Sequence, residues 1–123
     1  MGTAIQHGAP ELLARRGAIQ DCLRERLETN ARTLAAACAG GPLVPLPREG
    51  GWYGVLRLPR GWTDDETALR LLREEGVLVH PGYFYDFADE DLIVLSLICA
   101  PEVFAKGVDR ITALGARGQG RAR

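Results

Sequence analysis

The stretch Gly50-Gly51-Trp52-Tyr53-Gly54-Val55-Leu56-Arg57-Leu58 decides the fold of this 123-residue chain. It is the longest strand-like run, it lies near the middle, and helical patterns flank it on both sides. The glycine pair permits a sharp bend or a close backbone approach, and Pro59 ends the run. We predict a central strand near 51–58, with the indole of Trp52 in the core on the same side as Leu56.

The composition predicts one globular domain without a nucleic-acid partner. A chain of 123 residues that is 46% apolar and 25% charged is long enough to bury its own core. Its formal net charge of −1 indicates neither nucleic acid nor an anionic membrane as a partner. No apolar run approaches the ~20 residues of a membrane span, and no signal-peptide pattern is present. We therefore expect a cytoplasmic protein.

The three cysteines predict neither a metal site nor a disulfide. Cys22, Cys38 and Cys99 lack the spacing of metal ligands. Cys22 and Cys38 fall on one predicted helix, roughly 24 Å apart at 1.5 Å per residue, which no disulfide can span. We expect buried, reduced thiols.

Apolar periodicity predicts three helices. The first covers 10–39, with Pro10 in its first turn, and Gly40 and Gly41 end it. Its apolar stripe comprises Leu12, Ile19, Leu23, Leu27, Leu34 and Cys38. The second covers 63–75, where Thr63 and Glu66 match a capping box and Ala68, Leu69 and Leu72 form the buried side. The third covers 101–114, with Val103, Phe104, Val108, Ile111 and Leu114 facing inward.

The order of elements predicts an α+β fold. Besides the central strand, we expect strands at 77–80, apolar and covered on both faces, and at 92–98. Residues 42–49 read as an extended connector. The order α-β-α-β-β-α indicates a small, mostly antiparallel three-stranded sheet with helices packed on one face. We divide the chain into a lead-in (1–9), a single α+β domain (10–114) and a flexible tail (115–123).

One face of the central strand is predicted to stay exposed. Alternation places Tyr53, Val55 and Arg57 on the face that no predicted helix covers. Four aromatic residues also crowd the loop 83–87, and they cannot all point inward. We expect a pocket or a partner surface at this loop, whose aromatic residues are Tyr83, Phe84, Tyr85 and Phe87.

The polar residues do not form a catalytic constellation in sequence. His7 lies in the lead-in, and His80 can bind or titrate, although a hydrogen-bonded structural role is favoured. The acidic residues Asp86, Asp89, Glu90 and Asp91 lack the glycine and final glutamate of a calcium loop, which favours a solvated turn. Ser96 has no nucleophile-elbow glycines around it. We predict no catalytic residue and no metal ligand.

Three segments, in order, resemble one enzyme family. Residues 50–53, 76–84 and 92–97, the last followed by Pro101 and Glu102, resemble the C-terminal small domain of fold-type-I pyridoxal-phosphate-dependent aminotransferases. The similarity is to the aspartate and alanine aminotransferase-like branch, class I/II. It runs from about Ile5 to Leu114, nearly the whole chain.

The resemblance implies a position near a substrate entrance. In that family the long first helix links the large cofactor domain to the small domain, and the glycine pair and the Pro-Gly-aromatic loop lie near the substrate. The residues that this implies as pocket lining are Gly51, Trp52, Tyr53, Arg57, Gly82, Tyr83, Phe84 and Val94.

Two departures from the family bear on function. The family's Schiff-base lysine belongs to the large domain, upstream of this chain. Val94 stands where the family commonly places the arginine that grips the substrate carboxylate, two residues before Ser96. Arg57, beside Tyr53, is the alternative source of positive charge.

The resemblance implies amino-group transfer between an amino acid and a 2-oxo acid by a longer, homodimeric polypeptide. This domain would close over the substrate and pack on the large domain of the same polypeptide. Pyridoxal phosphate would serve the full-length enzyme and would not bind this chain, which alone would be inactive.

The alternative is a self-contained α+β module that binds a small molecule or another protein. A native product much larger than 13.4 kDa distinguishes the first interpretation from the second. A free-standing enzyme has no catalytic constellation to support it.

Overall fold

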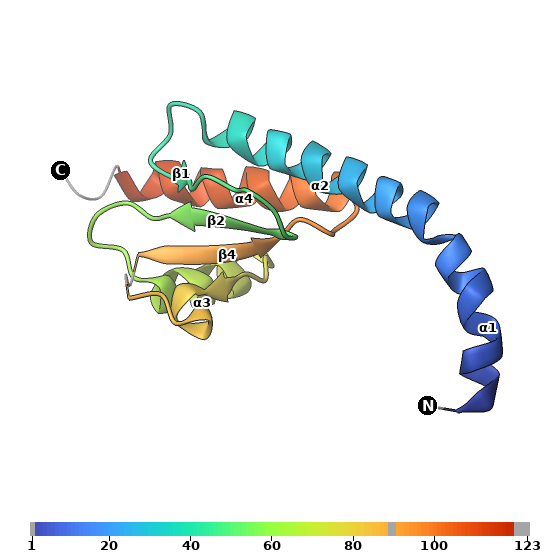
Figure 1. The fold of residues 1–123 in the computed structure, drawn as a ribbon. Helices are drawn as coiled ribbons and strands as arrows, with labels where there is room; N and C mark the ends of the chain where they lie inside the picture. The colour runs from blue at the N-terminus through green and yellow to red at the C-terminus, as the bar shows by residue number, and fades with distance from the viewer. Residues whose placement is uncertain (1, 89–90, 120–123) are drawn as a thin grey trace.

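The computed structural model describes residues 2–88 and 91–119, and in the last helix the side chains up to residue 117. It contains two consecutive helices, a four-stranded sheet and two further helices (Figure 1). The elements are α1 (Thr3–Ala14), α2 (Arg16–Cys38), β1 (Val44–Pro45), β2 (Tyr53–Arg57), α3 (Asp64–Glu75), β3 (His80–Pro81), the 3-10 helix η1 (Gly82–Tyr85), β4 (Leu92–Ser96) and α4 (Pro101–Gln119).

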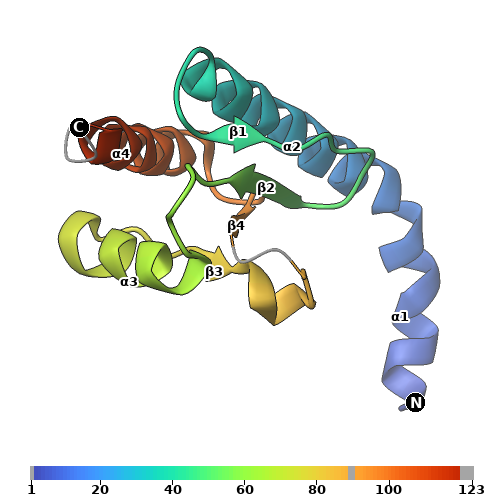
Figure 2. The ribbon, with the colours of Figure 1, turned by 90° about the vertical axis from the view of Figure 1, so that its left-hand side faces the viewer.

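The sheet has the order β1-β2-β4-β3, and every neighbouring pair is antiparallel. The core residues of α2, α3 and α4 pack on the same face of the sheet, and Figure 2 shows α3 and α4 on one side of the strands. This arrangement confirms the α+β class. The prediction of three strands was wrong, because the connector 42–49 supplies a fourth. Val44 pairs with Arg57 and Pro45 with Leu56. Proline is tolerated there because β1 is an edge strand, with one side free of ladder bonds.

The strand predicted at 77–80 is also displaced. Gly76 ends α3 in the left-handed conformation (φ 64°), and the Val77 amide donates to the Leu71 carbonyl at 3.0 Å. This helix-end geometry holds the chain away from the sheet, so pairing starts only at His80. Leu78 is 73% exposed and Val79 is buried. The expectation that this apolar run is covered on both faces was therefore wrong.

The long first helix is two helices. Helix α1 begins at Thr3, inside the predicted lead-in, and contains Pro10 in its interior. The chain breaks at Arg15, whose amide donates to the Leu12 carbonyl three residues back and tightens the backbone there. None of the residues of α1, all of them described, is buried. Figure 1 shows α1 projecting away from the sheet, so the predicted stripe reaches the core only in α2.

The core lies between the inner sheet face and three helices. On the sheet, Gly54 lets α2 come close, because a Cβ there would lie 3.0 Å from Leu34 Cδ2 and 3.3 Å from Leu97 Cδ2. The buried apolar residues of this core are Leu34, Cys38, Leu43, Leu56, Leu58, Leu71, Val79, Ile93, Leu95, Leu97, Phe104, Val108, Ile111 and Leu114.

Two helix faces differ from the prediction. On α3 the buried residues are Asp64, Thr67 and Leu71, whereas Leu69 and Leu72 are nearly half exposed. These two leucines lie on the side of the helix that the sheet does not reach. On α4, Val103 is 63% exposed, although its other four predicted core residues are buried.

The start of α3 is capped differently from the prediction. Thr63 is the N-cap residue, but its side chain makes no capping hydrogen bond. The carboxylate of Asp64 accepts from the Asp65 amide at 2.9 Å instead. The acidic residues of the first turn also stabilise α3, because negative charge is favourable near the positive N-terminal end of the helix dipole.

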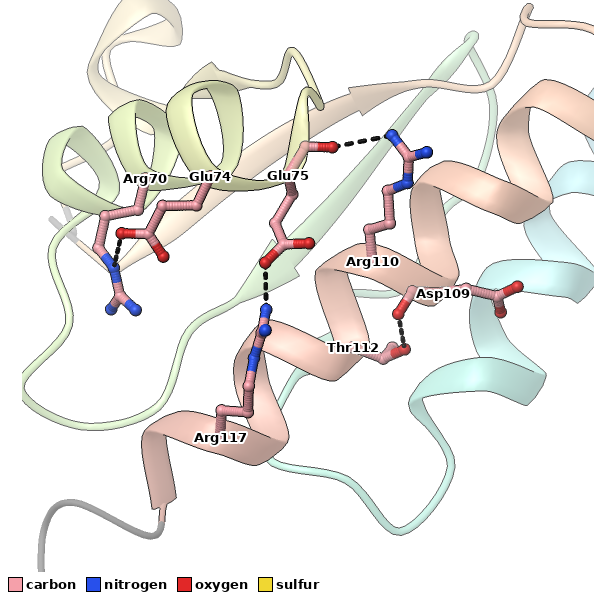
Figure 3. Close-up of polar contacts among 7 residues, drawn as sticks. All are labelled: Arg70, Glu74, Glu75, Asp109, Arg110, Thr112 and Arg117. Carbon is pink, nitrogen blue, oxygen red and sulfur yellow. Dashed lines mark hydrogen bonds and ion pairs between the residues drawn. The ribbon is translucent and has the colours of Figure 1, made fainter.

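Helix α4 continues past its predicted end to Gln119, and Gly115 is buried. The tail predicted from 115 is therefore helical as far as 119, and residues 120–123 lie outside the described chain. Figure 3 shows how α3 holds α4: Arg110 donates to the Glu75 carbonyl at 2.8 Å, and Arg117 pairs with the Glu75 carboxylate.

Asn30 joins helix α2 to the turn between β4 and α4. Its side chain is fully buried, and Nδ2 donates to the carbonyls of Leu97 at 2.9 Å and Cys99 at 2.8 Å. Arg26 donates to the intervening Ile98 carbonyl at 3.4 Å. The Asn30 Oδ1 atom has no hydrogen-bond partner among the described residues. A single amide therefore fixes where β4 ends and α4 begins.

We expect Asn30→Ala to lower the free energy of unfolding by about 2–4 kcal/mol, because two backbone carbonyls lose their donor. Asn30→Asp, nearly the same in shape, should cost at least as much, since a carboxylate oxygen would face those carbonyls. Urea unfolding measures both, with Glu28→Ala on an exposed turn of α2 as the control. Wild-type stability of Asn30→Asp would contradict this role.

Candidate functional site

The outer face of the sheet carries the candidate site. Cross-strand pairing places Tyr53 opposite Ser96, Val55 opposite Val94, and His80 on the other side of Val94. In the described chain, the core residues of α2, α3 and α4 lie on the opposite face, and Figure 2 shows α3 and α4 together on one side of the strands. Val94 is nevertheless only 3% exposed. The aromatic loop 82–87 folds back over this face and covers it.

Gly82 and Asp64 fix this loop. A Cβ on Gly82 would lie 2.8 Å from the Leu92 carbonyl oxygen, so only glycine lets the loop pass so close to β4. The Tyr83 amide donates to the buried Asp64 carboxylate at 3.1 Å, which joins the loop to the start of α3. Asp86, at φ 55°, then ends the 3-10 turn.

Three aromatic rings meet above Val94. Tyr85 stands edge-on to Tyr53 with 5.4 Å between ring centroids, and it stacks on Phe87 at 6.3 Å. The Tyr85 hydroxyl is hydrogen-bonded to His80 Nδ1 at 2.8 Å. Desolvation raises the pKa of the Tyr85 phenol, and a hydrogen bond and charge interaction with Tyr53 raise it further. Tyr85 is therefore a neutral hydroxyl at physiological pH.

These rings form one wall of a groove of about 290 Å³, which we call the outer groove. The segment 46–50, between β1 and β2, forms the facing wall. The sheet forms the floor between the two walls. The lining residues are Leu46, Pro47, Arg48, Glu49, Gly50, Tyr53, Val55, Tyr85, Phe87 and Val94.

Of the predicted pocket residues, Tyr53 and Val94 line this groove. Gly51, in the left-handed conformation (φ 73°), accepts from Arg48 through its carbonyl at 3.0 Å. Trp52 is 52% exposed and contacts Tyr53 edge-on at 6.5 Å, so its predicted place in the core was wrong. The strand begins only at Tyr53, and the core-side alternation therefore does not extend to residue 52.

Arg57 is committed to an ion pair. Its guanidinium donates to both carboxylate oxygens of Asp91, at 2.9 and 3.0 Å. Both side chains are about a third exposed or more, so the pair contributes little to stability. The positive charge of Arg57, which we predicted as the alternative partner for a substrate carboxylate, is therefore already paired with Asp91.

Gly82 lies beneath the loop, and Tyr83 and Phe84 lie outside the groove. The rings of Tyr83 and Phe84 meet edge-on at 4.7 Å, and both are more than half exposed. The predicted pocket set thus missed Tyr85 and Phe87, although the crowding of aromatic residues in 83–87 pointed to them.

The predicted exposure of this sheet face is confirmed in part. Tyr53 is 40% exposed, whereas Val55 and Arg57 are half-buried. The aromatic loop and the 46–50 segment account for the difference, because they cover the strand in place of a helix.

The other polar candidates take structural positions. The described residues contain no group of three or more His, Cys, Asp or Glu that could hold a metal ion. Asp89 and Glu90 lie outside the described residues. Cys38 is buried, and its burial raises the pKa of the thiol, whereas Cys22 and Cys99 are exposed, contrary to prediction. Among the helices of residues 2–88 and 91–119, none combines the length and apolar character that crossing a membrane requires.

This fold is that of solved aminotransferases. The aromatic aminotransferase of Pyrococcus horikoshii matches with a TM-score of 0.76 at 20% identity, over 85% of this chain and 28% of its own. The α-aminoadipate aminotransferase of Thermus thermophilus matches with a TM-score of 0.71 at 24% identity, over 98% of this chain and 30% of its own. At these identities the likeness concerns the fold alone.

Two curated relatives share more sequence identity with this chain than these two structures do. An LL-diaminopimelate aminotransferase of Oleidesulfovibrio alaskensis is 32% identical over 96 residues, which are 78% of this chain and 24% of that protein. One from Dehalococcoides mccartyi strain CBDB1 is 31% identical over 90% of this chain and 27% of its own length. No protein-family model matches. The predicted resemblance to a part of the fold-type-I pyridoxal-phosphate aminotransferases is thus confirmed in sequence and in fold. The chain spans about a quarter of the curated relatives it matches.

The residues present do not fit the cofactor of that family. Lys106 is the only lysine in the sequence, and it is exposed on α4. It lines a depression with Val103 and Arg110, and it does not line the outer groove. An exposed amine lacks the desolvated enclosure that activates a lysine nucleophile.

We expect Asp64→Ala to free the aromatic loop, because the Tyr83 amide loses its acceptor. Hydrogen exchange at that amide should accelerate about tenfold or more, and stability should fall by about 1–3 kcal/mol. The control is Asp65→Ala, at the exposed neighbouring position. Unchanged exchange at Tyr83 in Asp64→Ala would show that the loop is held by other contacts.

Proposed function

We propose that this chain is the C-terminal small domain of a pyridoxal-phosphate-dependent aminotransferase. In the full-length enzyme it serves amino-group transfer between an amino acid and a 2-oxo acid. The observation that carries this proposal is a match that covers 78% and 90% of this chain but only 24% and 27% of two aminotransferases. The catalytic lysine then lies outside this chain, and this chain supplies no residue that forms a covalent bond with the cofactor.

Two exposed surfaces support a large neighbouring domain. Helix α1 leaves its apolar residues in solvent, among them Leu12 and Leu13 at more than 60% exposure. Tyr83 and Phe84 add a second apolar patch beside the outer face. Patches of this kind mark interaction sites. We assign them to the large domain of the same polypeptide, with the domain closing over the substrate so that water is excluded.

The assignment of substrate-lining residues is part of the same proposal. Tyr53 and Val94, in the outer groove, are the predicted residues that the loop and the strand bring together. The remaining predicted residues do not line the groove: Gly51 and Trp52 precede β2, Arg57 ends it, and Gly82, Tyr83 and Phe84 belong to η1. The full-length protein is proposed to be a homodimer, as the resemblance implies, and to be cytoplasmic.

One observation favours the self-contained module as the second candidate. The chain's own loop covers Val94 and completes the outer groove without any further domain. The mass of the native gene product separates the two candidates, because the aminotransferase requires a polypeptide far larger than 13.4 kDa. Transaminase activity of that longer polypeptide on a panel of amino donors then tests the proposal. A native product of this size alone would contradict it.

We expect this chain alone to form no stoichiometric adduct with pyridoxal phosphate. The Lys106 amine is exposed, so it lacks the desolvated site that activates a lysine nucleophile. The test is titration with pyridoxal phosphate, reduction with borohydride and mapping of the modified residues. Lys106→Arg is the matched control for background labelling. Saturable labelling of Lys106 at one equivalent would place the cofactor site in this chain and overturn the proposal.

A further inference from the structure

The depression that Lys106 lines is a hollow of about 310 Å³ between the 76–79 segment and helix α4, and we call it the α4 hollow. It shares no lining residue with the outer groove. Two of its apolar lining side chains are largely in solvent, Leu78 at 73% and Val103 at 63% exposure. Exposed apolar side chains around a cavity of this size indicate a site for an apolar group.

Gly107 keeps the α4 hollow open. It lies inside α4 and lines the hollow, and a Cβ at this position would meet nothing within 4 Å outside its own stretch of helix. Close packing therefore does not require glycine here, although glycine inside a helix is less favourable than alanine. The missing side chain leaves open space on the helix stripe that carries Val103 and Arg110, four residues before and three residues after it.

The charged side chains that line the hollow are all positive. Lys106 and Arg110 stand about one helical turn apart on α4, and none of the lining residues is Asp or Glu. The acidic residues of α4, Glu102 and Asp109, do not line the hollow. The α4 hollow therefore combines an apolar surface with uncompensated positive charge.

Neither positive side chain is paired with a carboxylate of the described chain. Within residues 2–88 and 91–119, Lys106 has no hydrogen bond and no ion pair. Arg110 uses one nitrogen for the Glu75 carbonyl at 2.8 Å, and the Glu75 carboxylate pairs with Arg117 instead (Figure 3). A carboxylate that enters the hollow thus meets two cations whose charge is still available.

We propose that the α4 hollow binds a linear aliphatic carboxylate. Its hydrocarbon chain contacts Leu78 and Val103 and fills the space above Gly107, and its carboxylate pairs with Lys106 and Arg110. An inorganic anion would leave the apolar side chains in water, and a neutral alkane would leave both cations unpaired. The residues of this chain form the whole site, so the inference does not depend on the proposed function.

The first test uses the 123-residue chain and three probes, octanoate, octylamine and butanoate, in two-dimensional amide NMR titrations below micelle-forming concentrations. We expect octanoate to shift the amides of Leu78, Val103 and Gly107. It should bind about fivefold more tightly than octylamine, because the cations attract one head group and repel the other. It should bind about tenfold more tightly than butanoate, since each buried methylene strengthens binding by up to about fourfold.

Three results of these titrations would overturn the proposal. The first is the absence of octanoate shifts around the α4 hollow. The second is octanoate shifts confined to the outer groove. The third is binding of octylamine or butanoate that equals or exceeds that of octanoate.

Two variants test the two halves of the site separately. Gly107→Leu should fill the hollow and weaken octanoate about tenfold or more. The matched control is Gly8→Leu, inside α1, where a Cβ also meets nothing within 4 Å. Lys106→Gln, at an exposed side chain, should weaken octanoate about threefold and leave 1-octanol unchanged. Octanoate affinity equal to wild type in both variants would overturn the proposal.

Cys99 provides a second measurement that does not depend on amide shifts. Its thiol is exposed and lines the hollow, whereas Cys22 is exposed on α2. Bound octanoate should slow the reaction of Cys99 with iodoacetamide and leave the rate at Cys22 unchanged, as peptide mass spectrometry measures. Equal slowing of both thiols would show non-specific binding and would overturn the proposal.

The longer polypeptide of the proposed aminotransferase should give the same protection of Cys99. If octanoate does not protect Cys99 there, another part of that polypeptide covers the α4 hollow, and the proposal is overturned. Transaminase activity of the same polypeptide is a separate measurement that bears on the proposed function alone.

Discussion

The buried amide of Asn30 is the constraint on which the arrangement of layers depends. By donating to two carbonyls just after β4, it fixes α2 against the point where α4 begins. Apart from the longer hydrogen bond from Arg26 to the Ile98 carbonyl, the contacts that hold α2 on the sheet are apolar and non-directional, and apolar contacts alone would tolerate sliding along the helix axis. A directional pair of bonds in a water-free site removes that freedom. The close approach at Gly54 is possible only in this register, because it aligns Leu34 with the one strand position that lacks a side chain.

The same logic governs the outer face, where a polar group again positions an apolar surface. Asp64 begins α3 on the inner side, yet its carboxylate reaches the amide of Tyr83 in the aromatic loop. The two faces of the sheet are thereby coupled: the helix that closes the core also sets the height of the loop above Val94. Gly82 makes this possible, since the loop crosses β4 at a distance that no Cβ permits. The packing of the core therefore helps to determine the geometry of the outer groove.

Much of this architecture could be predicted because the spacing of apolar residues along the sequence agrees with which of them are buried. Leu56, Leu58, Ile93 and Leu95 lie where alternation places them, and the helix ends at Cys38 and Glu75 follow glycine signals. The failures arise where long-range contacts override local pattern. Leu69 has the spacing of a core residue, yet it is nearly half exposed because it lies on the side of α3 that faces away from the sheet. Tyr85 could not be distinguished from Tyr83 and Phe84 by sequence, since a 3-10 turn decides which ring of the run faces the strand. No periodicity signals the pairing of β1, because it contains only two residues.

The two edges of the sheet share one feature that limits how the molecule can associate. Each edge strand is two residues long and ends in proline, Pro45 in β1 and Pro81 in β3. Proline offers no amide hydrogen, so neither border can template another strand. Growth of the sheet into a continuous intermolecular ribbon is blocked at both sides. Backbone pairing is therefore disfavoured at both borders, and the exposed apolar side chains of helix α1 offer a contact surface that shape and charge make selective.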